Sequence, residues 1–212
     1  MLLDPSEMRQ DYDKDQLLEE MVDADPIRQF ASWFEDARNG ELMEPNAMSL
    51  STATADGGVS SRMVLMKGFD ERGFTFFTSY DSRKGQELAE NSRAALLFWW
   101  DRLHRQVRIE GTVTRVDPAE SDAYFATRPH GSRIGASTSP QSRVIEHREW
   151  LEARFAEAAE AFPDDVPRPA SWGGYRVTPD AIEFWQGRRS RLHDRLLYSR
   201  NADGWKIERL AP

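Results

Sequence analysis

The sequence of 212 residues contains no cysteine. Disulfide bonds, thiolate metal ligands and cysteine nucleophiles are therefore excluded. Long apolar runs are also lacking, since the longest, Ala94 to Trp100, is far shorter than the roughly 20 residues of a membrane-spanning helix. The first residues carry acids and no apolar stretch, so we expect no signal peptide. These absences fit a reducing compartment, and we expect the protein in the cytoplasm.

An excess of positive charge is absent too. The chain has 28 Lys and Arg against 36 Asp and Glu, which gives a net charge of −8. This balance disfavours a generic attraction to nucleic acid or anionic lipid, and we expect neither nucleic acid nor a membrane as a partner. Clustered metal ligands, a Walker loop and a dinucleotide-binding glycine motif are missing from the sequence, so we expect no metal site. A site for an anion must be built locally.

From residue 47 onward, the hydrophobic pattern has a period of two. Short runs rich in β-branched and aromatic residues alternate with Asp/Gly turn signals, which predicts antiparallel strands. The predicted strands are Ala47–Thr54, Ser60–Phe69, Phe74–Ser79, Ala94–Trp100, Arg105–Val116, Gly174–Val177, Ala181–Gln186, Arg191–Tyr198 and Trp205–Leu210. So many antiparallel strands in a short chain favour a closed or nearly closed barrel, which removes unpaired edges.

Helical spacing is confined to a few segments. The predicted helices are one after Asp25-Pro26 that ends near Asn39-Gly40, then Arg83–Glu90, Pro118–Thr127 and Ser142–Phe162. Residues 1–24 are polar and aperiodic, and predict an N-terminal arm that is ordered only where it docks. Residues 25–212 predict a single domain. The expected fold class is mainly β with flanking helices (α+β).

Cations stand at the predicted start of one helix, in Ser82-Arg83-Lys84-Gly85. Cations in a first turn oppose the positive end of the helix dipole, so a compensating anion is indicated. A bound phosphate would meet the free N–H groups there together with both side chains. Solvated surface charge is the alternative.

Two more cations, Arg62 and Lys67, lie five residues apart in one predicted strand. In a regular strand they would point to opposite faces and would serve different anions or different parts of one site. Charges that protect an edge strand are the alternative.

A second phosphate cradle is predicted around Tyr124, Arg128 and Ser132. The first two are spaced i, i+4 at the end of a predicted helix, and Ser132 follows in a glycine-containing loop. A phenol, a guanidinium and a hydroxyl can converge on one phosphate monoester. The helix dipole would explain Arg128 alone, but not the other two.

The densest basic patch lies near the C-terminus, where Arg191, His193 and Arg195 alternate. In the predicted strand they project from one face, and like charges so placed repel unless an anion or a planar π-system lies between them. Gln106 lies on a polar strand face with Arg108 and Glu110, which by itself is typical of solvent exposure.

Taken together, these segments resemble the pyridoxine (pyridoxamine) 5′-phosphate oxidase family over nearly the whole chain. The matching segments are Arg9-Gln10-Asp11-Tyr12, Asp25-Pro26, Arg62 to Lys67, Ser82-Arg83-Lys84, Arg105-Gln106-Val107, Tyr124 to Ser132, Gln141-Ser142, Trp172-Gly173-Gly174, Phe184 to Gly187, Arg191 to Arg195 and Leu210-Ala211-Pro212. The C-terminal segments are the most specific. The resemblance implies an FMN-binding split β-barrel that works as a homodimer, with two flavin sites at the subunit interface.

The resemblance also implies residue roles. Flavin contacts are expected at Arg62, Met63, Val64, Leu65, Met66, Lys67, Phe77, Thr78, Arg83, Lys84, Gln106, Gln141, Ser142, Trp185 and Arg195. Substrate contacts are expected at Lys67, Tyr124, Arg128, Ser132, Arg191, Leu192 and His193, with Arg9, Gln10, Asp11 and Tyr12 as a closing arm. The family often has an aromatic or similar residue at the position of Phe77, so a backbone contact is expected there. Arg191 and His193 are the implied catalytic residues.

The implied reaction is the oxidation of pyridoxamine or pyridoxine 5′-phosphate to pyridoxal 5′-phosphate, the last step of vitamin B6 coenzyme synthesis and salvage. Dioxygen is the implied acceptor, with release of hydrogen peroxide, and of ammonia from the amine. Arg191 is expected to cover the substrate ring, and His193 to act as a base or an orienting group. The alternatives are a related split-barrel flavin reductase and a non-enzymatic carrier of flavin or pyridoxal phosphate.

Overall fold

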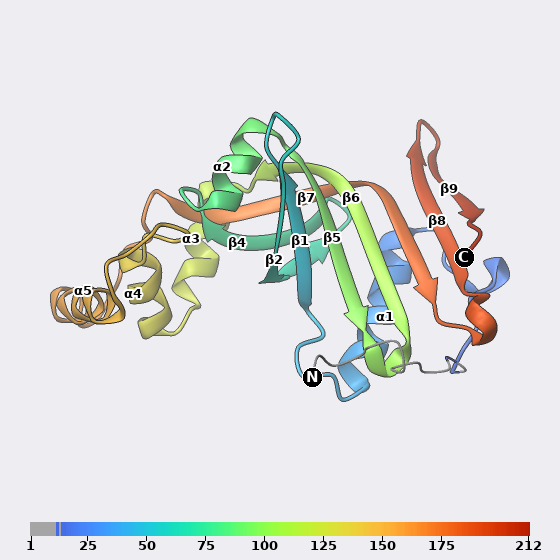
Figure 1. The fold of residues 1–212 in the computed structure, drawn as a ribbon, viewed down its shortest axis with the longest axis horizontal. Helices are drawn as coiled ribbons and strands as arrows, with labels where there is room; N and C mark the ends of the chain where they lie inside the picture. Colours follow the sequence, from blue (N-terminus) through green and yellow to red (C-terminus); the bar gives the residue numbers. More distant parts are fainter. Residues whose placement is uncertain (1–11, 13) are drawn as a thin grey trace, which may run out of the picture. The chain divides into compact units, whose positions relative to one another are not determined.

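The computed structural model describes residue 12 and residues 14–212 (Figure 1). The described chain divides into two compact units. The terminal unit comprises the N-terminal residues up to Ser49 together with Ala95–Glu110 and Pro179–Pro212, and the middle unit comprises Leu50–Ala94 and Gly111–Thr178. The predicted boundary between an arm and a single domain at residue 25 stays a prediction.

Antiparallel strands form the bulk of the fold. They are β1 (Ala47–Ala53), β2 (Val59–Leu65), β3 (Gly68–Asp70), β4 (Gly73–Ser79), β5 (Arg93–Trp100), β6 (Arg105–Arg115), β7 (Trp172–Gln186), β8 (Asp194–Asn201) and β9 (Gly204–Arg209). The hydrogen-bonded order is β2-β1-β5-β6-β7-β4-β3, with β8 paired to β7 and β9 paired to β8. The predicted fold class, mainly β with flanking helices, is confirmed.

In the terminal unit, α1 (Pro26–Asn39) supplies the aromatic core. The helix begins where predicted, because the Asp25 side chain accepts a hydrogen bond from the Ile27 N–H at 2.8 Å and Pro26 occupies the first turn. Its buried Phe30 ring lies 5.2 Å from that of Phe98, and Trp33 lies 5.2 Å from Phe184. Such edge and tilted ring pairs add to the burial of apolar area.

The segment before α1 packs against the rest of the terminal unit. Leu17 is buried, the Asp15 carboxylate lies 2.8 Å from the Arg105 guanidinium, and the Tyr198 hydroxyl donates to the Asp23 carbonyl at 2.8 Å. The short 3₁₀ helix η2 (Glu19–Met21) is held by Arg209, which pairs with Glu19 at 2.7 Å. This part of the predicted arm is therefore docked.

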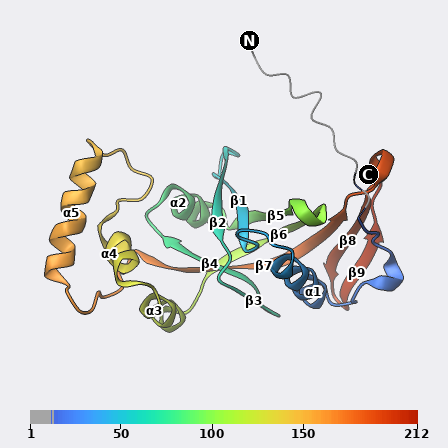
Figure 2. The ribbon, with the colours of Figure 1, turned by 90° about the horizontal axis from the view of Figure 1, so that it is seen from below.

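The middle unit carries the remaining helices, α2 (Arg83–Glu90), α3 (Pro118–Ala126), α4 (His130–Thr138) and α5 (Arg148–Ala161). In Figures 1 and 2, α3, α4 and α5 lie together, with α4 beside α5. Their core consists of Phe125, Ile134, Val166 and Trp172, against which Phe77 and Tyr124 pack. This small core sets the position of α3 and of the first turn of α4.

The predicted strand Ser60–Phe69 is wrong in its extent. The structure ends β2 at Leu65 and begins β3 at Gly68, so Lys67 lies in the connection. The Lys67 N–H donates to the Thr75 carbonyl at 2.8 Å, which fixes that connection beside β4. Arg62 and Lys67 therefore do not lie in one regular strand, and the prediction that they point to opposite faces of such a strand is wrong.

The predicted strand Arg191–Tyr198 is also wrong at its start. Residues Arg189–Arg191 form the 3₁₀ turn η4, and β8 begins only at Asp194. Ser190 and Arg191 have φ of 56° and 61°, so two consecutive left-handed residues interrupt the extended chain. The predicted alternation of Arg191, His193 and Arg195 on one strand face does not occur.

Two helix predictions need correction. The predicted helix Ser142–Phe162 begins only at Arg148, because His147 is its N-cap and its ring nitrogen accepts from the Trp150 N–H at 3.1 Å. The segment after Pro129, predicted as a loop, forms α4. Its two glycines lower helix propensity, but burial of Ile134 in the core outweighs that cost.

The predicted strands Gly174–Val177 and Ala181–Gln186 are one continuous strand, β7. Its first part, from Trp172 to Val177, pairs with β4, and its last part, from Ala181 to Gln186, pairs with β8. Pro179, which lacks an N–H to donate, lies between the two paired parts.

Two helical glycines of the middle unit give a matched test of this packing. A Cβ on Gly85 would lie 2.2 Å from the Tyr80 carbonyl oxygen, whereas a Cβ on Gly135 would meet nothing within 4 Å. We expect Gly85→Ala to destabilise the protein by about 1–3 kcal/mol. Gly135→Ala should instead be neutral or stabilise it by up to about 1 kcal/mol, since alanine is the better helix former. Denaturant unfolding measures both, and equal effects of the two changes would contradict the close approach of α2 to Tyr80.

Candidate functional site

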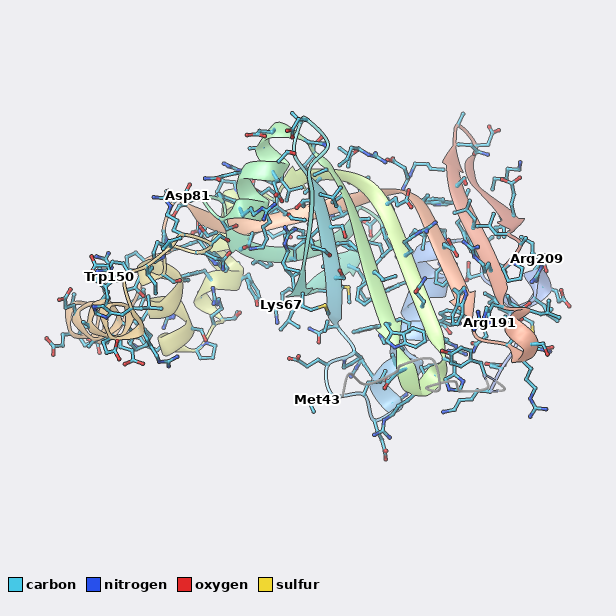
Figure 3. All side chains as sticks on the ribbon, viewed as in Figure 1. Met43, Lys67, Asp81, Trp150, Arg191 and Arg209 are labelled. Atoms are coloured by element: carbon cyan, nitrogen blue, oxygen red, sulfur yellow. The ribbon has the colours of Figure 1, made fainter. Side chains whose placement is uncertain are left out.

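A cavity of about 450 Å³ lies in the middle unit. It is lined by Arg62, Met63, Val64, Leu65, Lys67, Phe77, Thr78, Lys84, Tyr124, Arg128, Pro129, Ser132, Gln141 and Trp172. Lys67, labelled in Figure 3, lies just after β2. Residues of both predicted phosphate cradles therefore line one cavity: Lys84 from the first, and Tyr124, Arg128 and Ser132 from the second.

Lys84 is the most buried cation of this cavity. The Ser82 side chain caps α2 by accepting from the Gly85 N–H, which places Lys84 in the first turn. The Lys84 ammonium donates to Gln141 Oε1 at 2.8 Å and to Thr78 Oγ1 at 3.2 Å. Both partners are neutral, and no carboxylate of the described residues forms an ion pair with it. Burial, and then the positive charge of Arg62, lower the pKa of Lys84 to about 8, although the charge of Glu87 opposes the shift.

Arg128 lies on the aromatic side of the cavity. Its guanidinium sits 4.7 Å from the Trp172 ring centroid, and its buried Nη1 atom has no hydrogen-bond partner among the described residues. Burial lowers the pKa of Arg128. A buried N–H group without a partner costs free energy, so this atom is suited to a ligand oxygen.

Tyr124 and Phe77 complete that wall. Their rings stack with centroids 4.0 Å apart and an interplanar angle of 21°. Burial raises the pKa of Tyr124, while the charge of Arg128 opposes the shift, so its phenol remains a donor at neutral pH. Ser132 lies in the first turn of α4, close to the point where Pro129 begins that helix. The unpredicted helix thus places the predicted hydroxyl in the cavity.

The charged side chains that line the cavity are all positive. Arg62, Lys67, Lys84 and Arg128 line it, and no carboxylate belongs to its lining. Only Arg62 forms an ion pair among these four in the described part of the chain, with Glu87 at 3.2 Å. Because unpaired buried cations are costly, the arrangement favours binding of anionic groups.

Three predicted residues of the middle unit do not line the cavity. Met66 is buried, Arg83 has a largely exposed side chain and pairs with Glu87 at 2.8 Å, and Ser142 is exposed beside Gln141. The prediction missed Trp172 and Pro129 as lining residues. Trp172 stood in a matched segment, but nothing in the sequence indicated that its ring would face Arg128.

The other predicted residues that the structure describes lie in the terminal unit, where Tyr12, Trp185 and His193 cluster. The Tyr12 ring lies 5.8 Å from each of the other two, and Trp185 lies 4.6 Å from His193. Gly187 allows Tyr12 to pack this close to the chain, because a Cβ at position 187 would lie 2.8 Å from the Tyr12 side chain. A second cavity of about 610 Å³ is lined by Tyr12, Lys14, Asp15, Gln16, Arg188, Arg189, Ser190 and Leu192.

His193 has a defined protonation state in this cluster. Its Nδ1 accepts a hydrogen bond from the Arg188 N–H at 3.0 Å, so the neutral ring carries its proton on Nε2. Burial, and then the charge of Arg191, lower the pKa of His193. At neutral pH the ring is therefore a hydrogen-bond donor through Nε2.

Arg195 and Gln106 are also placed in the terminal unit. Arg195 Nε donates to the buried Glu183 carboxylate at 2.7 Å, and its Nη1 donates to the Ala211 carbonyl at 2.9 Å. Arg191, labelled in Figure 3, is the second of the two left-handed residues and ends η4. Gln106 is half-buried on β6. Arg9, Gln10 and Asp11 of the predicted closing arm lie outside the described residues.

Within the described ranges, no helix is long and apolar enough to cross a membrane. The same residues contain no group of three or more His, Asp or Glu side chains that could hold a metal ion.

Comparison with known proteins places the chain in a family. Residues 34–161 match the family described as pyridoxamine 5′-phosphate oxidase, and residues 172–212 match the pyridoxine 5′-phosphate oxidase C-terminal dimerisation region. Two relatives named pyridoxine/pyridoxamine 5′-phosphate oxidase come from Paraburkholderia phymatum, 58% identical over 208 residues, and Nostoc punctiforme, 59% identical over 209 residues; each alignment covers 98% of both chains. The chain belongs to the pyridoxamine 5′-phosphate oxidase family, and it is an oxidoreductase.

Solved structures agree on the fold. PhzG from Burkholderia lata, solved with tetrahydrophenazine-1-carboxylic acid, is 35% identical with a TM-score of 0.89, over 93% of this chain and 98% of its own. A pyridoxamine 5′-phosphate oxidase-related, FMN-binding protein from Nostoc punctiforme is 18% identical with a TM-score of 0.73, over 90% of this chain and 100% of its own. The predicted split-barrel fold is confirmed.

The pKa of Lys84 predicts how anion binding depends on pH. Below about pH 8 the ammonium attracts a phosphate dianion, and above it the neutral amine does not. With FMN as the phosphate-bearing probe, we expect the affinity measured by fluorescence titration to fall roughly tenfold between pH 8 and pH 9.5. Lys84→Met should bind more weakly at pH 7.5 and show a flat profile. An equal pH slope in both proteins would contradict the assignment of the titrating group.

Proposed function

We propose that the protein is an FMN-dependent oxidase that converts pyridoxamine or pyridoxine 5′-phosphate to pyridoxal 5′-phosphate. Dioxygen is the acceptor, hydrogen peroxide is released, and the amine substrate also yields ammonia. The observation that carries the proposal is a cavity lined by four cations and no carboxylate, in a protein of net charge −8. Three of these cations have no ion-pair partner among the described residues. The names of the relatives support it.

The cavity fits a flavin phosphate at the Lys84 end. The ammonium of Lys84 faces only neutral partners, and its charge is therefore available to a phosphate. Arg62, Thr78 and Gln141 lie around it, and the segment from Met63 to Leu65 lines the cavity beside them. When FMN is bound, it supplies the hydride acceptor for the reaction.

The Arg128 end fits the phosphate of the substrate. The Arg128 Nη1 donor is buried without a partner, and the Tyr124 phenol and Ser132 hydroxyl line the same cavity. Lys67 adds a further cation. A phosphate held far from the reacting carbon provides binding energy that orients that carbon.

Arg191 and His193 act on the substrate ring in this proposal. The guanidinium of Arg191 covers the ring and stabilises negative charge that develops on it. His193 orients the reacting substituent by donating from Nε2, because its Nδ1 is already occupied by the Arg188 N–H. Trp185 and Arg195 are proposed as further flavin contacts. The protein acts as a homodimer in the cytoplasm, with flavin sites at the subunit interface, and the match to a dimerisation region supports the dimer.

The direct test is to add FMN and excess pyridoxamine 5′-phosphate to the protein in air and to follow pyridoxal 5′-phosphate and peroxide. We expect many equivalents of both per protomer. A flavin reductase would need a nicotinamide or deazaflavin donor instead, and a carrier would yield one equivalent or none. Either of these results would overturn the proposal.

Arg128→Ala tests the substrate phosphate site. Removing a charged donor remote from the chemistry should raise KM about tenfold or more, with kcat and FMN content nearly unchanged. Steady-state kinetics and the flavin absorbance of the purified protein measure these quantities. Arg143→Ala, at an exposed position outside the cavity lining, is the control and should match the wild type. Loss of FMN from Arg128→Ala would show that the two phosphate sites are assigned the wrong way round.

Arg191→Ala tests the catalytic assignment. We expect kcat to fall by about 10² or more while FMN stays bound, because the side chain acts on the developing charge and not on the cofactor. Unchanged turnover at saturating substrate would reject this role.

A further inference from the structure

Glu87 is a buried carboxylate one helical turn beyond Lys84. It is only 3% exposed, and four donors from three elements surround it. Thr52 of β1 and Ser60 of β2 donate to Oε2 at 2.5 and 2.6 Å, and Arg83 of the same helix donates to Oε1 at 2.8 Å. Arg62 of β2 adds an ion pair at 3.2 Å. Burial alone would raise the pKa of Glu87, but these hydrogen bonds and the charge of Arg62 lower it to about 2, so it is ionised at neutral pH.

The carboxylate belongs to a set of contacts that fixes the Arg62 guanidinium. Arg62 Nη1 donates to Thr52 Oγ1 at 2.6 Å and to the Leu50 carbonyl at 3.1 Å, while Nη2 faces Glu87 and Ser60. Thr52 and Ser60 each contact both Glu87 and Arg62. A guanidinium bound on both terminal nitrogens has few alternative orientations. The orientation of the Arg62 side chain, which lines the cavity, is therefore fixed by its contacts with Glu87, Thr52 and Ser60.

Glu87 also balances the charge next to Lys84. The positive charge of Arg62 disfavours the ammonium form of Lys84, and the negative charge of Glu87 favours it. The other groups against the amine, Thr78 on β4, Gln141 and Ser82, are neutral. The Arg83 guanidinium donates to Glu87. Glu87 is the one carboxylate that acts on both cavity cations at this end, within the described residues.

We propose that Glu87 is a positioning residue for the phosphate of the flavin: it fixes the Arg62 guanidinium and supplies the compensating negative charge beside the cavity cations, without itself lining the cavity. The inference rests on the proposed function, since it assigns the Lys84 end of the cavity to the flavin phosphate. Loss of the Glu87 charge would leave the two cations facing each other without compensation. A less fixed Arg62 guanidinium and the uncompensated positive charges would each weaken binding of the phosphate. The other contacts to the flavin would stay in place.

The experiment compares FMN with riboflavin, which differs only in lacking the phosphate. Apoprotein fluorescence titrations with both ligands, from pH 7 to pH 9.5, are carried out on the wild type and on Glu87→Gln. We expect Glu87→Gln to weaken FMN binding at pH 7.5 about tenfold and riboflavin binding less than twofold. The pH at which FMN affinity declines should also move to lower values, because Lys84 loses the neighbouring negative charge.

Glu90→Gln is the matched control, since Glu90 ends the same helix but is exposed. It removes the same charge and should leave both affinities and the pH profile unchanged. Ser60→Ala is the milder variant, because it removes one donor to Glu87 and keeps its charge; it should weaken FMN binding severalfold without moving the pH profile. Calorimetric melting of each variant confirms that it is folded at the titration temperature.

Three outcomes would overturn the inference. Equal weakening of FMN and riboflavin by Glu87→Gln would show a merely structural role for the carboxylate, as would an unshifted pH profile. A wild type that binds FMN no more tightly than riboflavin would reject the phosphate site itself, and the proposed function with it. The first two results leave the proposed function standing and the third does not, so failure of the inference and failure of the proposed function are distinguishable.

Discussion

The arrangement of the middle unit depends on cations that are buried without carboxylate partners. Lys84 donates only to neutral oxygens, and Arg128 keeps a buried N–H group without a partner among the described residues. In a protein with more acids than bases, such groups destabilise the fold unless a ligand compensates them. The close approach of Gly85 to Tyr80 and the core around Trp172 hold the two groups in place. The proposed anion binding is thus a consequence of how the unit packs.

The local signals in the sequence were sufficient for much of this site. The cap at Ser82, the cations after it and the i, i+4 pair Tyr124 and Arg128 predicted two cradles. The structure brings Lys84, Tyr124 and Arg128 to the lining of one cavity, but not Arg83. Helix α1 and strand β4 likewise begin within a residue of the predicted positions, because capping residues and turn glycines are local signals.

The failures have physical causes of a different kind. Helix α4 forms because Ile134 is buried by residues distant in sequence, a tertiary effect that overrides the low propensity of its two glycines. Ser190 and Arg191 adopt the left-handed conformation, although glycine and asparagine are the residues that usually do so. The sequence therefore contained no signal that the predicted strand is interrupted there. Glu87 was overlooked because a glutamate in a helix is ordinary until its burial between Arg62 and Arg83 is seen.

The two units contribute different chemistry to the proposed enzyme. The middle unit offers charge for phosphate groups, while the terminal unit offers the aromatic cluster of Tyr12, Trp185 and His193 and a histidine whose tautomer is fixed by a backbone N–H. The cations of the middle unit would provide binding energy through the phosphates, and the residues of the terminal unit would orient the reacting group. Substitutions in the two units are therefore expected to affect KM and kcat differently.

The central claim is that one cavity holds two phosphate groups, one at each end. A crystal structure of the protein with FMN and pyridoxal 5′-phosphate tests it most directly. The account predicts one phosphate in contact with the Lys84 ammonium and the other in contact with the Arg128 guanidinium. A phosphate group found away from both residues, or both ligands competing for the Lys84 end, would contradict it.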